Sequence, residues 1–180
     1  PANPSSVHGF GRSARLLVES ARESVATLAG CHPANIVFTS GGTESNNLVL
    51  AQYEHVITSA IEHDSVRHAH DRCQVIGVDA NGIIDLDQLA ATISMIDDTV
   101  KPNTIISVMA ANNETGVLQP IEKIAEMACN SNLAFHSDMV QVFGKKHLDF
   151  ANSGISYASF SAHKIGGPTG VGALLVRPGC

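Results

Sequence analysis

Hydrophobic residues along the chain follow a helical spacing in some segments and form short continuous runs in others. The first helical pattern covers residues 13–29, where apolar positions recur three and four residues apart, and Gly30 predicts the helix end. Strand-like apolar runs follow at 36–39, 56–58, 75–78, 105–109, 133–136, 157–161 and 173–176. Helical patterns lie between most of these runs, at 44–51, 65–72, 86–93 and 121–130.

This alternation predicts a three-layer α/β/α fold, with a mainly parallel sheet and helices on both faces. The connection between residues 161 and 173 is short and rich in glycine, which leaves no room for a crossover helix. We therefore expect the last strand to run antiparallel to its neighbour. The chain begins at Pro1 and stops at Cys180 directly after a strand, so we expect residues 1–180 to be one domain of a longer protein.

Composition and charge exclude several classes of function. No apolar run approaches the length that crosses a bilayer, and the first residues lack the features of a secretory signal. The net charge of −6, without a basic block, argues against nucleic acid as a partner. The four cysteines form no CxxC pair, which indicates thiols in a reducing compartment such as the cytoplasm.

Polar residues follow several predicted strands, and ligands of open α/β sheets bind at the carboxyl ends of strands. After the run 36–39, the sequence Ser-Gly-Gly-Thr places Gly42 and Thr43 at a helix start, where backbone N–H groups favour a phosphate. The same residues also fit an ordinary turn between strand and helix. The absence of a Walker lysine and of GxGxxG argues against a nucleoside triphosphate or a dinucleotide.

Three further positions carry candidate chemistry at this edge. Lys164 stands among small residues and is a candidate Schiff-base lysine, for which we expect partial desolvation, although a solvated loop lysine fits as well. Asp138 is a candidate partner for a protonated ring nitrogen, or a helix cap, and Gln141 lies one turn later. His63 could stack on a flat ring or relay protons, or simply begin a helix.

Together these positions favour a pyridoxal 5'-phosphate enzyme, because they combine a phosphate site, a lysine, a ring acid and a stacking histidine. The nearby His68, His70 and Asp71 do not favour a metal site, since His68 and His70 would lie on different faces of a helix.

Six segments in order resemble the successive motifs of cysteine desulfurases, which belong to the class V aminotransferase group of fold type I enzymes. These segments are NPSSVHGFGR, FTSGGTESNNL, EHDSV, NNETGVLQPI, HSDMVQVFGK and SAHKIGGPTGVGALLVR. The resemblance covers essentially the whole chain. It implies the large cofactor-binding domain of an enzyme that converts L-cysteine to L-alanine.

The resemblance also implies a role for each candidate residue. Lys164 would hold the cofactor and move protons, His63 would stack on its ring, and Asp138 would pair with the ring nitrogen. Gln141 would contact the ring oxygen and Asn113 would lie beside the substrate. The phosphate would be bound by Gly42, Thr43, Ser161 and His163. The implied partners are a second copy of the chain and a sulfur acceptor such as an iron–sulfur scaffold, in the cytoplasm or an organelle matrix.

The chain also departs from the family pattern. Met139 stands where the family usually has Ala, and a preceding segment and a smaller domain with the nucleophilic cysteine are expected but not present. None of Cys31, Cys73, Cys129 and Cys180 matches the motif of that cysteine. We therefore expect this chain to bind the cofactor but not to complete sulfur transfer alone. A selenocysteine lyase, a cysteine-sulfinate-type lyase, a non-catalytic scaffold and another phosphate-binding domain stay open as alternatives.

Overall fold

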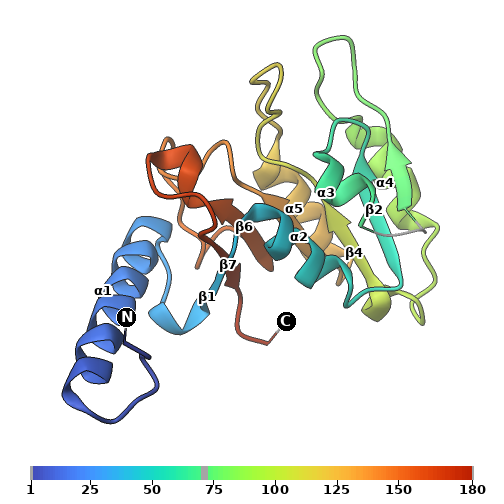
Figure 1. The fold of residues 1–180 in the computed structure, drawn as a ribbon. Coiled ribbons are helices and arrows are strands. Elements are labelled where there is room, and N and C mark those ends of the chain that lie inside the picture. Colours follow the sequence, from blue (N-terminus) through green and yellow to red (C-terminus); the bar gives the residue numbers. More distant parts are fainter. Residues whose placement is uncertain (1, 70–72, 180) are drawn as a thin grey trace.

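The computed structural model describes residues 2–69 and 73–179, and one seven-stranded sheet organises this part of the chain (Figure 1). The strands are β1 (Ile36–Thr39), β2 (His55–Ser59), β3 (Cys73–Ile76), β4 (Thr104–Ser107), β5 (Ala134–Asp138), β6 (Tyr157–Ser161) and β7 (Gly172–Val176). Their spatial order is β1-β7-β6-β5-β4-β2-β3.

The direction of the strands confirms the predicted sheet. The β2–β3, β2–β4, β4–β5 and β5–β6 pairs are parallel, and β7 runs antiparallel to β6. Only a 3₁₀ turn, η3 (Ala162–Ile165), intervenes between β6 and β7, so the chain reverses without an α-helix. β7 also pairs antiparallel with β1, which places the first and last strands side by side.

Helices cover both faces of the sheet, which confirms the three layers. On one face, α2 (Gly42–Leu50) and α3 (Asp64–Arg67) bury Leu50 and Val66 against Val56, Ile105 and Leu174. On the other face lie α1 (Gly9–Ala29), α4 (Leu86–Ser94) and α5 (Ile121–Asn130), which contribute to the larger hydrophobic cluster. Both clusters exclude water from the strands between them, which is the main favourable contribution to the fold.

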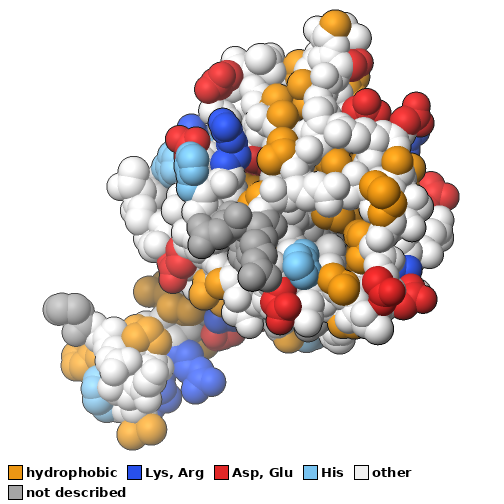
Figure 2. Space-filling model, turned by 90° about the vertical axis from the view of Figure 1, so that its right-hand side faces the viewer, with side chains coloured by type: hydrophobic (Ala, Val, Ile, Leu, Met, Phe, Trp, Pro, Cys, Tyr) orange, Lys and Arg blue, Asp and Glu red, His pale blue; other side chains and the backbone are white. Residues whose placement is uncertain are grey.

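Helix α1 packs on the body only through its last turns. Ala26 and Ala29 are buried, whereas Phe10, Leu16 and Leu17 are 80%, 71% and 75% exposed. Figure 2 shows the first turns as a lobe that projects from the body and carries hydrophobic side chains. The predicted apolar face of α1 is therefore present, but most of it packs against no other element of the described chain.

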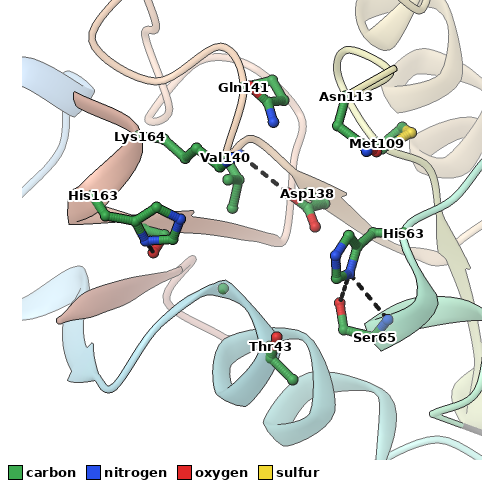
Figure 3. A pocket seen from close by; sticks show the side chains of 12 residues that line it. Thr43, His63, Ser65, Met109, Asn113, Asp138, Val140, Gln141, His163 and Lys164 are labelled. Carbon is green, nitrogen blue, oxygen red and sulfur yellow. Dashed lines mark hydrogen bonds between the residues drawn. The ribbon is translucent and has the colours of Figure 1, made fainter. Parts of the chain in front are cut away.

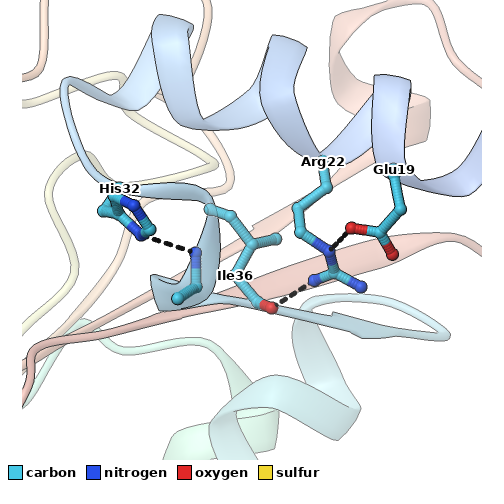
Figure 4. A network of polar contacts seen from close by, with 5 residues as sticks. Glu19, Arg22, His32 and Ile36 are labelled. Carbon is cyan, nitrogen blue, oxygen red and sulfur yellow. Dashed lines mark hydrogen bonds and ion pairs between the residues drawn. The ribbon is translucent and has the colours of Figure 1, made fainter.

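A small polar network ties α1 to the edge of the sheet (Figure 4). The guanidinium of Arg22 donates to the carbonyl of Ile36 at 2.6 Å and to Glu19 at 3.1 Å. It also lies over the ring of Phe38, 4.9 Å from the ring centre. Next to it, His32 caps the η1 turn (Pro33–Asn35) through a bond from the Ala34 N–H at 3.1 Å. These contacts fix the chain between α1 and β1.

Two element boundaries differ clearly from the sequence prediction. Helix α1 begins at Gly9 instead of residue 13, because His8 caps it by accepting the Gly11 N–H. Helix α3 covers only Asp64–Arg67, although a helix over 65–72 was predicted, and residues 70–72 lie outside the described part of the chain. The strands confirm the prediction to within about two residues, the usual uncertainty of such boundaries.

Candidate active site

A pocket of about 210 Å³ opens at the carboxyl ends of β2, β4, β5 and β6 (Figure 3). All nine residues predicted from the sequence line it: Gly42, Thr43, His63, Asn113, Asp138, Gln141, Ser161, His163 and Lys164. Ser65, Met109 and Val140 complete the lining. The parallel strands explain this gathering, because their carboxyl ends meet at one edge of the sheet.

The turn after β1 delivers Gly42 and Thr43 to one wall of the pocket. Gly42 is the first residue of α2, so the free N–H groups of this nine-residue helix face the pocket region. A Cβ atom on Gly42 would lie 2.7 Å from Cγ2 of Val140, and the missing side chain therefore leaves a narrow gap between helix and loop. Backbone donors and absent bulk suit an anion such as a phosphate.

Residues after β6 form the opposite wall. Ser161 is the last residue of β6, and its hydroxyl lies 2.8 Å from Nδ1 of His163. Lys164 follows in η3 and is exposed at the pocket rim. The expected partial desolvation of Lys164 is therefore wrong for this chain, because η3 and the glycine-rich segment after it lie at the surface and bury little.

Asp138 supplies a buried carboxylate at the floor of the pocket. It is the last residue of β5 and is 7% exposed, and its Oδ2 accepts the Asn46 amide at 2.8 Å while Oδ1 accepts the Val140 N–H at 3.0 Å. Desolvation raises the pKa of Asp138, against the opposing effect of the Asn46 bond. Among the described residues, no lysine or arginine forms an ion pair with it.

His63 projects into the pocket from the start of α3, as Figure 3 shows. The ring caps this short helix: its Nδ1 accepts the Ser65 N–H at 3.1 Å and lies 2.8 Å from the Ser65 hydroxyl. The residue is exposed, so its ring has one face available to a ligand. Asn113 and Gln141 lie on loops after β4 and β5, on the far side of Asp138 in the same view.

Glu62, next to His63, lies behind the pocket and was not singled out in the sequence. It is 5% exposed, and its Oε1 accepts the Met109 N–H at 2.9 Å and the Ser59 hydroxyl at 2.5 Å. Burial raises the pKa of Glu62 to about 8, with a further contribution from the nearby charge of Asp138. The neutral acid therefore joins the ends of β2 and β4 at neutral pH.

Sequence reasoning also missed Asn46, Ser65, Met109 and Val140. One signal was present for Asn46, which lies four residues after Gly42 and so on the same face of the predicted helix. No comparable signal exists for Met109 or Val140, which lie in the loops after β4 and β5 and line the pocket only because of how these loops fold.

The described residues contain no group of three or more His, Cys, Asp or Glu side chains suited to a metal ion. His70 and Asp71 of the metal hypothesis lie outside the described part of the chain. Within residues 2–69 and 73–179, no helix combines the length and the apolar character that a bilayer requires. Cys31, Cys73 and Cys129 do not line the pocket, and Cys180 is not described.

The residues present fit pyridoxal phosphate on the evidence of their own geometry. Asp138 is a buried acid without a lysine or arginine partner among the described residues, and a protonated pyridine nitrogen is a cation of suitable size. The helix start at Gly42 and the Ser161–His163 pair offer donors for a phosphate on opposite walls. Lys164 offers an exposed amine in the lining of the same pocket.

Comparisons with known proteins agree on one family. The family described as Aminotransferase class-V matches residues 1–179. The chain is 42% identical to the mitosomal cysteine desulfurase of Trachipleistophora hominis, over 97% of this chain and 42% of that protein. It is 38% identical to the cysteine desulfurase IscS of Dictyoglomus turgidum, over 98% of this chain and 47% of that protein. The chain thus spans about half the length of the curated relatives it matches.

Solved structures give the same result for the fold. A NifS-like protein from Rickettsia africae superposes with a TM-score of 0.92 at 36% identity, covering 98% of this chain and 51% of that one. A structure described as SspA in complex with cysteine superposes with a TM-score of 0.86 at 36% identity, covering 98% and 53%.

Proposed function

The chain belongs to the class-V aminotransferase family, and on this premise we propose that it is the pyridoxal-phosphate-binding large domain of a cysteine desulfurase. The whole protein would convert L-cysteine to L-alanine and pass the sulfur on as a persulfide. The observation that carries the proposal is the buried Asp138 carboxylate, which shares one pocket with Lys164 and His63 and forms no ion pair with a lysine or arginine among the described residues.

Each wall of the pocket has a task in this proposal. Asp138 keeps a proton on the ring nitrogen, and the Asn46 amide and the Val140 N–H hold its carboxylate in place. The phosphate is bound by Gly42, Thr43, Ser161 and His163. When bound, the protonated ring withdraws electrons from the substrate α-carbon, so that the α-proton becomes acidic.

The remaining residues act on the ligand and the substrate. Lys164, whose amine lines the pocket, would hold the cofactor through Nζ and would move the proton at the substrate α-carbon. His63 would stack on the ring and assist proton transfer, and Gln141 would donate to the ring oxygen. Asn113 orients the substrate beside them.

Covalent capture of the cofactor tests this proposal. The full-length protein mixed with pyridoxal phosphate and reduced with borohydride should gain the mass of the reduced cofactor on the peptide that contains Lys164. Lys164→Ala should abolish the added mass and the visible absorbance band. Lys145→Ala, which removes an exposed lysine outside the pocket, should change neither. If Lys164→Ala keeps the added mass on this peptide, the proposal is wrong.

Substrate and partners follow from the relatives and have separate tests. The proposed substrate is L-cysteine, which is named in the complex of one similar structure. The full-length protein should release sulfide from L-cysteine in the presence of a thiol. Release of selenide from selenocysteine without release of sulfide would instead support the lyase alternative. The proposed sulfur acceptor is an iron–sulfur scaffold protein.

A homodimer is also part of the proposal. It is supported by the exposed hydrophobic side chains of α1, among them Phe10, Leu16 and Leu17, which a second copy could cover. Sedimentation of the full-length protein should give twice the monomer mass. We also propose a location in the cytoplasm or an organelle matrix, since similar proteins include bacterial, mitochondrial and mitosomal enzymes.

A further inference from the structure

Asn46 lies beneath the pocket on the buried face of α2 and contacts two residues of different elements. Its Nδ2 lies 2.8 Å from Asp138 Oδ2 and 2.9 Å from Ser65 Oγ. An amide nitrogen carries two hydrogens and accepts none, so Asn46 donates one hydrogen to each. This orientation places the donating nitrogen of the amide against the carboxylate oxygen of Asp138 and the hydroxyl of Ser65, which both accept.

The oxygen of the Asn46 amide is less well placed than its nitrogen. Asn46 is fully buried, and its Oδ1 has no hydrogen-bond partner in the described part of the chain. An unsatisfied buried acceptor costs about 1–3 kcal/mol, so an asparagine at this position is unfavourable for stability by itself. The two hydrogen bonds that Nδ2 donates explain why an asparagine nevertheless occupies this position.

The hydrogen bonds from Asn46 to Ser65 and from Ser65 to His63 are all donated in the direction of His63. Because its hydroxyl accepts from Asn46, the single hydrogen of Ser65 is left to point at His63 Nδ1, 2.8 Å away. The Ser65 N–H donates to the same nitrogen at 3.1 Å. Figure 3 shows both bonds reaching one side of the ring, while its other side extends toward the open pocket. A nitrogen that accepts two donors carries no proton, so the neutral ring carries its hydrogen on Nε2.

We propose that Asn46 is a positioning residue with two tasks: it holds the Asp138 carboxylate and, through Ser65, it keeps His63 in the Nε2–H tautomer. In this tautomer the neutral ring presents its Nε2–H to the pocket as a hydrogen-bond donor, while Nδ1 stays bonded to Ser65. Where a cofactor is concerned, this inference rests on the proposed function.

Nitrogen-15 NMR of histidine-labelled full-length protein tests the tautomer directly. We expect a protonated Nε2 and an unprotonated Nδ1 for His63, both with and without pyridoxal phosphate. In Ser65→Ala, the Nδ1 signal should move part of the way toward the value of an unbonded nitrogen, because the backbone N–H of residue 65 still donates to it. In Ser65→Thr, which keeps the hydroxyl, the signal should stay. A proton on Nδ1 of the wild-type protein overturns the proposal, as does the same signal in both Ser65 variants.

A labelled cofactor tests the task at Asp138. With nitrogen-15 in the pyridine ring, Asn46→Ala should move the ring signal toward that of an unprotonated pyridine, whereas Ser65→Ala should leave it unchanged. Asn47→Ala is the matched control, since Asn47 is the exposed neighbour on the same helix. The same ring signal in the Asn46 and Asn47 variants overturns this half of the proposal.

The two measurements distinguish failure of the proposed function from failure of this inference. A wild-type protein that binds no pyridoxal phosphate contradicts the proposed function. The nitrogen-15 signals of His63 still show whether the hydrogen bonds run from Asn46 through Ser65 to His63. Ser65 is only partly buried, so its variants keep the test decisive even if Asn46→Ala does not fold. Circular dichroism of each variant identifies that case.

Discussion

At the scale of single residues, the two neighbouring acids Asp138 and Glu62 differ in their hydrogen bonds. Asp138 accepts two hydrogen bonds that support its ionised form, whereas Glu62 Oε2 is buried without a partner among the described residues. The nearby negative charge of Asp138 also raises the pKa of Glu62. One acid is thus prepared to pair with a cation, and the other is a neutral link between β2 and β4.

Replacing Glu62 by Gln should remove part of the pH dependence of stability. The pKa of Glu62 is about 8 in the fold against an ordinary value of 4.5, so only the unfolded state releases its proton between these values. The free energy of unfolding therefore falls as pH rises through this window, in total by on the order of 4 kcal/mol, and levels off above it. Glu62→Gln keeps the shape of the neutral acid and should lack this fall.

Urea unfolding of both proteins at about pH 5 and about pH 8 measures the effect. Buried His136, whose pKa burial lowers to about 3, gives a slope of opposite sign below about pH 6.5. This slope is common to both proteins and cancels in the difference between them. An equal pH dependence in wild type and Glu62→Gln would contradict the neutral state of Glu62.

At the scale of elements, the two opposite walls of the pocket depend on how β7 lies between β1 and β6. Gly172 begins β7 and pairs with Thr39 on one side and Ser161 on the other, which are the last residues of their strands. A Cβ atom there would lie 2.5 Å from Gly41 Cα and 2.7 Å from the Phe160 carbonyl oxygen. Only a residue without a side chain lets the two walls approach this closely.

Gly172→Ala should accordingly destabilise the protein and weaken phosphate binding together. The clashes involve backbone atoms, so strands must move, and we expect a loss of about 1–3 kcal/mol in the free energy of unfolding. Urea unfolding and a titration with pyridoxal phosphate measure the two effects. Gly9→Ala, at an exposed helix start with its nearest atom 4.0 Å away, is the control and should be neutral or slightly stabilising. Equal stability of both variants would refute this explanation of Gly172.

At the scale of the whole molecule, the pocket gathers residues from Gly42 to Lys164 around one edge of the sheet. A ligand that binds there links α2, α3 and the loops after β4, β5 and β6. A ligand that binds only the folded state stabilises the whole fold.

Pyridoxal phosphate should therefore raise the melting temperature of the full-length protein. At a concentration one hundred times the dissociation constant, the stabilisation is about 2.7 kcal/mol. Asp138→Asn should show a smaller shift, because its neutral amide does not pair with the ring cation. Asp98→Asn, which changes an exposed acid outside the pocket, should keep the full shift. Thermal unfolding with and without the cofactor measures this, and equal shifts in both variants would count against pairing at Asp138.

The sequence by itself determined the elements, the parallel sheet with its reversed last strand, and the nine residues at the sheet edge. These features are local or follow from strand direction: the apolar periodicity fixes each element, and parallel strands end at one edge. The tertiary structure alone decided the pairing of β1 with β7, the exposure of Lys164, the neutral Glu62 and the bonds of Asn46. Burial and hydrogen-bond direction depend on which distant residues meet, and no spacing along the chain carries that information.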